Sequence, residues 1–178
     1  MQYIGKVVLA CLIGDYRRTR LHDLADNHEW VKQTTNLLLF GASEPFKLIV
    51  ALLSIRLKKV VEANLPCIVA VIDETIIGYP YATKWKERSA YRFSVESTIS
   101  LSNEFQRKGL GTVLYTSLLN KLKTLGINSV IGGITLQNPA SVGLHEKLGM
   151  EKVAHFSKVG FKFDQWLDVG YWQLSLNA

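Results

Sequence analysis

Residues 93–101 alternate cleanly between apolar and polar side chains. These nine residues alternate with a period of two, which is typical of a β-strand with one face in the core. The apolar positions are Phe93, Val95, Ile99 and Leu101, and the polar positions are Ser94, Glu96, Thr98 and Ser100. The sequence therefore predicts a strand whose polar face presents a single carboxylate, that of Glu96.

A loop with two glycines, residues 106–112, joins this strand to an amphipathic helix. Glycine lets a backbone turn tightly, so that several N–H groups face one anion. The positive end of the helix and the charges of Arg107 and Lys108 add to that attraction. The helix itself is indicated by leucines at i, i+4, i+8 and i+11, with Gly126 as its cap: Leu114, Leu118, Leu122 and Leu125. The pattern predicts a pyrophosphate-binding loop, and the alternative is an ordinary glycine-rich turn.

Two common nucleotide-binding motifs do not fit this loop. A Walker A loop requires G-x-x-x-x-G-K-[ST], which is absent. A Rossmann fingerprint requires glycine at position 114, where this chain has leucine. Both departures disfavour a nucleotide-binding regulatory module.

The remaining pattern predicts helices and strands around one sheet. We expect helices over 18–33 and 46–63, then strands over 67–72 and 75–82 joined by a turn at Asp73-Glu74. Pro80 places the second of these strands at an edge or marks a bulge. A strand over 129–136 precedes a short helix that Asn138 caps, with Pro139 in its first turn and Gly149 at its end. Two strands, 151–161 and 169–176, complete a single α/β domain over 1–178, a mixed sheet flanked by helices.

Composition excludes several classes of protein. The 178 residues carry a formal net charge of +6, but the lysines and arginines are scattered and no nucleic-acid-binding motif appears. The apolar stretches at 7–13 and 48–55 are too short to span a membrane. Two isolated cysteines and histidines without metal-ligand spacing predict neither a disulfide framework nor a metal site. We expect a cytoplasmic protein without nucleic-acid or membrane partners.

Two motifs together resemble the GNAT acetyltransferases. The run Gln106 to Gly111 is similar to their acetyl-CoA pyrophosphate motif, Q/R-x-x-G-x-G/A. Residues 138–150 resemble the pattern N-x-x-S/A-x-x-L-Y/H-x-x-x-G-F, with Met150 in place of the usual aromatic residue. The resemblance implies the GNAT fold and acetyl-CoA as co-substrate. It also implies a cofactor-binding set: Ile99, Ser100, Leu101, Gln106, Arg107, Lys108, Gly109, Leu110, Gly111, Thr112, Asn138 and Ser141.

A narrower resemblance indicates the acceptor. Residues 90–98, residues 162–170 and Leu144-His145-Glu146 are similar to phosphinothricin and methionine sulfoximine N-acetyltransferases. The similarity runs from about Leu65 to the end, whereas the first sixty residues match poorly. It implies a small amino-acid-like amine as substrate and a homodimer as the assembly.

Glu96 and His145 are the predicted catalytic residues. An ammonium must lose a proton before its nitrogen attacks a thioester, and the resemblance places Glu96 as the base. The alternative for Glu96 is a solvated strand residue. His145 stands where many GNAT enzymes have tyrosine, and an imidazole can protonate the leaving thiolate. Its alternative is a helix histidine packed or hydrogen-bonded for structure. Asn138 and Ser141 have a second role as helix cap and first-turn residue.

The predicted substrate-binding residues surround the Glu96 strand. Arg88 offers a guanidinium to a substrate carboxylate, and the others are Trp85, Tyr91, Val95 and Ser97. For Trp85 a structural role in the loop is the stronger alternative.

We therefore expect an acetyltransferase that acts by direct attack, because no Ser, Cys or His nucleophile set is visible. The alternatives are acetylation of a protein N-terminus or a polyamine, and a non-catalytic acyl-CoA-binding sensor. A sensor has no use for a base at Glu96, so that residue discriminates between enzyme and sensor.

Overall fold

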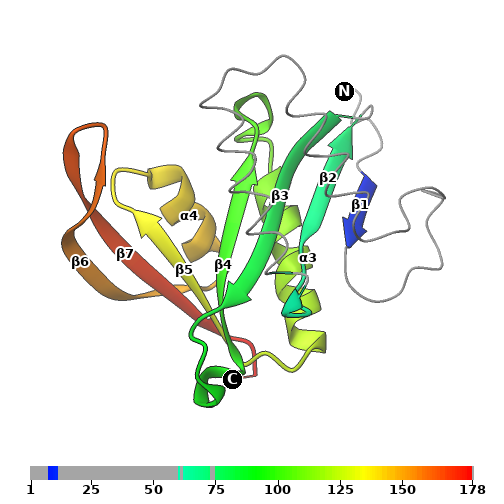
Figure 1. The fold of residues 1–178 in the computed structure, drawn as a ribbon. Coiled ribbons are helices and arrows are strands. Elements are labelled where there is room, and N and C mark those ends of the chain that lie inside the picture. The colour runs from blue at the N-terminus through cyan, green and yellow to red at the C-terminus, as the bar shows by residue number, and fades with distance from the viewer. Residues whose placement is uncertain (1–7, 12–59, 61, 73–74, 178) are drawn as a thin grey trace.

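Seven strands form one mixed sheet in the computed structural model, which describes residues 8–11, 60, 62–72 and 75–177 (Figure 1). The order across the sheet is β1-β2-β3-β4-β5-β7-β6. The strands are β1 Val8–Cys11, β2 Ile68–Ile72, β3 Thr75–Lys84, β4 Ser94–Leu101, β5 Ser129–Thr135, β6 Glu151–Lys162 and β7 Gln165–Ser175. Neighbouring strands run antiparallel except β4 and β5, which are parallel.

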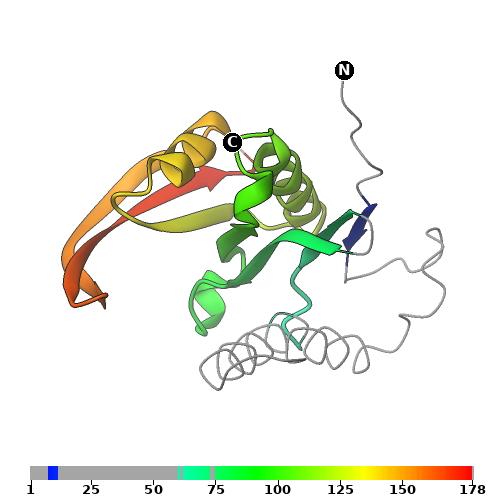
Figure 2. The same cartoon turned by 90° about the horizontal axis from the view of Figure 1, so that it is seen from above.

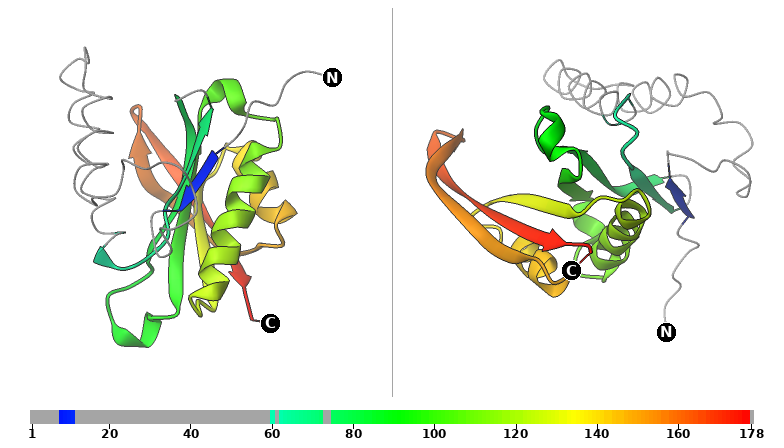
Figure 3. Two further views of the ribbon diagram at one scale, coloured as in Figure 1. Left: turned by 90° about the vertical axis from the view of Figure 1, so that its right-hand side faces the viewer. Right: turned by 90° about the horizontal axis from the view of Figure 1, so that it is seen from below.

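Two α-helices, α3 (Leu110–Thr124) and α4 (Pro139–Lys147), cover the same face of this sheet (Figures 2 and 3). The helix α3 packs on β2, β3 and β4, whereas α4 packs on β5. Short 3₁₀ helices, η1 (Ser89–Tyr91) and η2 (Asn103–Phe105), precede β4 and α3. The core between α3 and the sheet contains Leu114, Tyr115, Leu118, Leu122, Val95, Val130 and Trp172, all buried.

Most of the elements predicted from the sequence after residue 66 are confirmed. Asn138 caps α4 by accepting a hydrogen bond from the Ser141 N–H at 3.1 Å, and Pro139 opens that helix. Gly126 follows α3 with a φ of 75°, the left-handed conformation that favours glycine at a helix C-terminus. The helix expected over 18–33 lies outside the described residues, as do the turn at Asp73-Glu74 and nearly all of the helix over 46–63.

Of the two alternatives predicted for Pro80, the edge strand is wrong, because β3 is an interior strand, and the irregular pairing is confirmed. Proline cannot donate to a β-ladder and is usually confined to edges or irregular positions. Here the pairing of β2 with β3 shifts between Ala70 and Val71 and ends at Gly78. The next contact on that side is an isolated bridge from Tyr81 to Cys67. Pro80 therefore lies where the ladder is interrupted, although its other side pairs with Ile99.

Two residues expected in the core are exposed. Phe93 precedes β4 and is 48% exposed, with the Arg92 guanidinium over its ring. Leu125 follows the last turn of α3 and is 42% exposed. Both lie just beyond the end of their element, where the periodic pattern no longer determines which way a side chain points. The strand β7 also begins at Gln165, four residues before the predicted 169, and β1 was not predicted.

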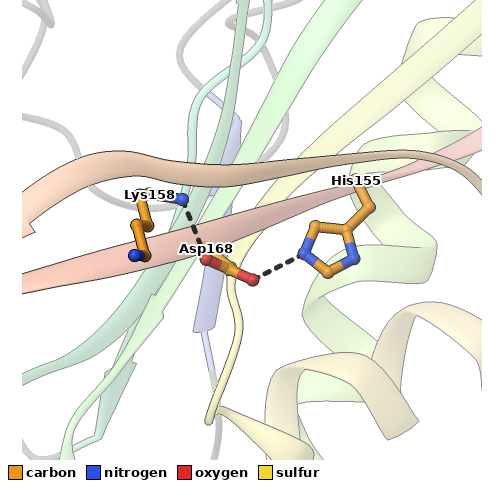
Figure 4. A network of polar contacts seen from close by, with 3 residues as sticks. All are labelled: His155, Lys158 and Asp168. Carbon is orange, nitrogen blue, oxygen red and sulfur yellow. Dashed lines mark hydrogen bonds and ion pairs between the residues drawn. The ribbon is translucent and has the colours of Figure 1, made fainter.

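The β6–β7 hairpin extends away from α3 at one side of the sheet (Figures 1 and 2). Its pairing is irregular between Phe156 and Gly160. The Asp168 carboxylate holds this irregularity, because it accepts hydrogen bonds from the Lys158 backbone N–H at 2.8 Å and from His155 Nε2 at 2.7 Å (Figure 4). These contacts lower the Asp168 pKa, the Lys158 N–H contributing most.

The core side of α3 supplies the first prediction. Replacing the fully buried Leu118 by alanine removes apolar contacts and leaves a cavity, so we expect the free energy of unfolding to fall by about 2–5 kcal/mol. Urea denaturation monitored by circular dichroism measures this. The control is Val113→Ala on the exposed side of the same helix, where Val113 is 51% exposed and the change should stay within about 0.5 kcal/mol. Equal effects of the two substitutions would contradict the packing described above.

Candidate active site

The loop before α3 is shaped as an anion cradle. Arg107 and Gly109 have φ of 60° and 80°, so the chain turns sharply twice within three residues. Gly109 is the N-cap of α3, and no side chain caps the helix. The Thr112 N–H donates to the Gly109 carbonyl at 3.1 Å, so in the first turn of α3 the N–H groups of Leu110 and Gly111 are left for a ligand at the positive end of the helix.

A cavity of about 650 Å³ lies against this loop. One wall is the loop itself, one is the end of β4 at Ile99 and Leu101, and one is α4. Arg107 and Lys147 supply positive charge from two of these walls. The full lining is Ile99, Leu101, Gln106, Arg107, Gly109, Gly111, Thr112, Asn138, Pro139, Ala140, Ser141, Gly143, Leu144 and Lys147.

Most of the predicted cofactor residues line this cavity, and three do not. Ser100 pairs with Tyr79 in the β3–β4 ladder, and Lys108 places its ammonium over the Phe105 ring. Leu110 packs against the core. Gly143 and Lys147 also line the cavity, although neither was predicted as a cofactor contact. Positions 140, 143, 144 and 147 recur at helical spacing, which indicates that they share one side of α4.

A second cavity, of about 210 Å³, continues from the first. The two share Ile99, Asn138 and Ser141 in their linings. The parallel pairing of β4 with β5 ends at Ser97 and Gly132, although both strands continue beyond it. The second cavity is lined by Ser97, Thr98, Ile99, Gly133, Ile134, Thr135, Asn138, Ser141 and His145, so it occupies the opening between the separating strands.

Glu96 lies beside this opening, on the sheet face opposite α3 and α4. A Cβ placed on Gly133 would be 3.3 Å from Glu96 Oε1, so the carboxylate borders a residue that lines the second cavity. Partial burial raises the pKa of Glu96 above its ordinary 4.5, and the positive charge of Lys86 offsets part of that rise. The geometry places a carboxylate with increased basicity at the end of the cavity system.

His145 lines the second cavity from the opposite face and is buried. Its Nδ1 lies 2.7 Å from the Ser141 carbonyl, and a carbonyl only accepts, so Nδ1 carries the hydrogen. Its ring contacts Tyr115 at a centroid distance of 5.1 Å and lies against Gly132, where a Cβ would be 2.6 Å from Nε2. Burial lowers the His145 pKa below 6.5, so the imidazole is neutral at pH 7 and Nε2 has no proton to give. These contacts favour the alternative role, a hydrogen-bonded histidine that shapes the cavity wall.

The structure corrects one predicted substrate contact on β4, that of Val95, and shows the Ser97 side chain turned to α3 although Ser97 lines the second cavity. Val95 is 1% exposed and its side chain belongs to the core, so it is not available to a substrate. The Ser97 hydroxyl is buried and lies 2.6 Å from the Tyr115 hydroxyl and 3.2 Å from the Ile131 carbonyl. Tyr115 in turn has its pKa raised to about 12 by burial, so its phenol is neutral. Val95 and Ser97 lie on the same face of β4, which packs on α3. Because serine is polar, the sequence did not indicate that position 97 faces the core.

The other predicted substrate residues lie on or near η1. Trp85 contacts Tyr171 of β7 edge to face, with ring centroids 5.7 Å apart, and thereby joins the same sheet face as Glu96. Arg88 and Tyr91 are exposed and line neither cavity. Tyr171 and Gly133 are site residues that the sequence did not reveal, because only the pairing of β5 with β7 brings them together.

The model of the acetyltransferase (GNAT) family matches residues 26–150. The chain belongs to the GNAT acetyltransferase family.

Several relatives in this family are also similar to this chain in sequence. A phosphinothricin N-acetyltransferase of Streptomyces viridochromogenes is 44% identical over 108 residues, 61% of this chain and 59% of that protein. An L-methionine sulfoximine/L-methionine sulfone acetyltransferase of Salmonella typhimurium is 33% identical over 112 residues, 63% of this chain and 66% of that protein. The chain thus matches about three fifths of the length of these curated relatives.

A solved structure extends the likeness along the chain. It is a GNAT superfamily phosphinothricin acetyltransferase from Sinorhizobium meliloti in complex with AcCoA, 28% identical with a TM-score of 0.70. The superposition covers 95% of this chain and 88% of the other. The resemblance stated from the sequence and the GNAT fold are both confirmed.

In the part of the chain that the structure describes, no cluster of three His, Cys, Asp or Glu residues is placed to hold a metal ion. No helix within those residues is long and apolar enough to cross a membrane.

Gly111 provides a test of the large cavity. Its Cβ would be 3.4 Å from Leu144 Cδ2, an ordinary contact, but the two methyl groups of valine would project further into the cavity. We expect Gly111→Val to raise the dissociation constant for coenzyme A about tenfold or more, and Gly111→Ala to raise it far less. Isothermal titration calorimetry measures both constants. A folded valine variant with unchanged affinity would show that coenzyme A binds elsewhere.

Proposed function

We propose that this protein is an N-acetyltransferase that moves acetyl from acetyl-CoA to the α-amine of a small amino-acid-like substrate. The observation that carries the proposal is the continuity of the two cavities. They share three residues and run from the loop of Arg107 and Gly111 to Gly133, which borders the Glu96 carboxylate. In this proposal the loop is the anion site and the Glu96 carboxylate is the base, and the two cavities lie between them.

The fit to acetyl-CoA follows from the lining of the passage. The open N–H groups at the start of α3, with Arg107, suit a pyrophosphate. The narrower opening between β4 and β5 suits a thin pantetheine arm, which unpaired backbone groups of separating strands can bind. The thioester end then lies near Glu96.

The reaction in this arrangement is a direct transfer. Glu96 accepts a proton from the substrate ammonium, directly or through water, and the free amine attacks the thioester carbonyl carbon. A C–N bond forms as the C–S bond breaks, and the second proton of the attacking nitrogen passes through water to the leaving thiolate. The neutral, Nδ1-protonated His145 is not a ready donor, so water is the proposed proton source.

The acceptor class rests on the relatives, which are named for phosphinothricin and for methionine sulfoximine. Both compounds are amino acids, so we extend that class to this chain. A protein N-terminus or a polyamine as acceptor, and a sensor without catalysis, remain as outcomes that an acetylation screen distinguishes. We also propose a single domain over 1–178 and a cytoplasmic location, which the scarcity of cysteines suits.

A homodimer is part of the proposal, and the exposed surface of the β6–β7 hairpin supports it. Six of its large apolar side chains are more than half exposed: Val153, Phe156, Val159, Phe161, Phe163 and Trp166. Phe161 and Trp166 contact each other edge to face and form an aromatic pair at the protein surface. Exposed large apolar side chains at this density are typical of an interface.

The dimer prediction is tested at Trp166, which is 63% exposed. Replacing it by glutamate puts a charge into the proposed interface, so we expect sedimentation velocity to show a dimer for the wild type and a monomer for Trp166→Glu. The control is Lys123→Glu on α3, far from the hairpin in the fold, which should leave the dimer intact. A monomeric wild type at micromolar concentration would contradict the prediction.

The base assignment is tested at Glu96. Glu96→Gln keeps the size of the side chain and removes its basicity, so we expect turnover to fall about 10²- to 10⁴-fold at pH 7. Coenzyme A affinity should survive, and the loss should shrink at high pH, where more of the amine arrives deprotonated. Because burial raises the Glu96 pKa, the wild-type rate should decline on acidification at a pH above 4.5. Initial rates of coenzyme A release across pH measure these effects.

Two results would count against the assignment in different ways. If Glu96→Gln has the wild-type rate and pH profile, Glu96 is not the base. If the wild-type protein binds acetyl-CoA but acetylates no amine in a broad screen, the protein is a sensor.

A further inference from the structure

Gly133 forms the floor of a gap between two side chains on the sheet face that carries Glu96. The strand β5 lies between β4 and β7, and Gly133 pairs directly with Tyr171. A Cβ built on Gly133 would be 3.3 Å from Glu96 Oε1 and 3.2 Å from Tyr171 Cε1. The carboxylate and the aromatic ring therefore lie on either side of the Gly133 backbone, with no side chain between them and little room for one. Gly133 itself is exposed.

The Tyr171 ring is fixed in this position by contacts from two other elements. Trp85 meets it edge to face at 5.7 Å, and Phe156 of β6 meets it edge to face at 5.6 Å. A ring held on two sides cannot turn to fill the gap above Gly133. The Lys86 ammonium already lies over the Trp85 ring, at 4.9 Å, so that ring is occupied by a cation of the protein itself.

A carboxylate opposite an aromatic ring suits one kind of group. The carboxylate forms charge-assisted hydrogen bonds with an ammonium, and the ring attracts a cation through its quadrupole. The narrowness of the gap favours a primary ammonium over bulkier cations. The gap also borders the smaller cavity, because Gly133 lines that cavity.

We propose that Gly133 and Tyr171, together with Glu96, form the subsite that binds the ammonium group of the acceptor. This proposal rests on the proposed acetyltransferase function and assigns specificity to two residues. Gly133 keeps the subsite open, and Tyr171 supplies its aromatic wall. The subsite selects primary amines and presents the nitrogen beside its base.

The first experiment adds a methyl group at Gly133. In steady-state kinetics with L-methionine sulfoximine as acceptor, Gly133→Ala should lower kcat/KM for the acceptor about 10- to 100-fold, because it displaces the amine. The coenzyme A dissociation constant should change less than about threefold, since most of the cofactor cavity is remote from Gly133. The control is Gly160→Ala on the hairpin, where a Cβ is 3.6 Å from Leu167 and makes an ordinary contact. It should have wild-type kinetics.

The second experiment separates charge recognition from shape. Tyr171→Phe keeps the ring and should retain the acceptor KM within about threefold, whereas Tyr171→Leu should raise it about 3- to 30-fold. The competitor 2-hydroxy-4-(methylthio)butanoate has a hydroxyl in place of the ammonium, so its inhibition constant should not change in Tyr171→Leu. A structural defect would instead weaken the acceptor and the hydroxy acid together.

The outcomes distinguish this proposal from the one on which it rests. A wild-type protein that acetylates no amine contradicts the proposed function and the subsite with it. An active wild type whose Gly133→Ala and Tyr171→Leu variants keep the acceptor KM contradicts the subsite alone. Equal weakening of acceptor and hydroxy acid in Tyr171→Leu shows that the ring acts by shape, which also overturns the ammonium assignment.

Discussion

The site depends on the point at which β4 and β5 stop pairing. Their parallel ladder extends from Ser94–Ser129 to Ser97–Gly132, and both strands then continue apart. Unpaired backbone groups of two separating strands need other partners, and a ligand that enters the opening can provide them. The opening also joins the two faces of the sheet, so a molecule held beside α3 and α4 can reach Glu96 on the other face.

Side chains of α3 and α4 contact the strands at that opening and fix its position. The Ser97 hydroxyl lies within hydrogen-bond distance of Tyr115 on α3 and of the Ile131 carbonyl on β5, at the last paired positions of the ladder. His145 on α4 fills the space next to Tyr115 and above Gly132, and its bond to the Ser141 carbonyl fixes the ring. Buried polar groups with satisfied partners of this kind hold a single arrangement. The positions that carry the reaction are therefore supported by the core.

The sequence predicts what depends on local pattern. The alternation of β4, the glycine loop and the Asn138 cap each involve residues close together in the chain, and the structure has all three. The sequence fails where an element ends, as at Phe93 and Leu125, or where the sheet order decides the outcome, as for Pro80 in an interior strand.

The site shows the same division. The loop residues and Glu96 carry a local signal of charge and spacing, whereas Gly133 and Tyr171 are 38 positions apart and meet only through the register of β5 with β7. Lys147 is separated from the loop by α3, β5 and most of α4, and the packing of α4 on β5 brings it to the cavity. Val95 and Ser97 were predicted beside Glu96, but their side chains face the opposite side of the sheet because neighbours along a strand alternate.

The central claim is that acetyl-CoA passes through the opening between β4 and β5 and places its acetyl group beside Glu96. A crystal structure of the protein with a stable thioether analogue of acetyl-CoA tests it most directly. The account predicts the pyrophosphate on the first-turn amides of α3, the pantetheine between the strands beyond Ser97 and Gly132, and the acyl group next to Gly133. An acyl group that ends on the α4 side of the sheet, out of reach of the Glu96 carboxylate, would contradict it.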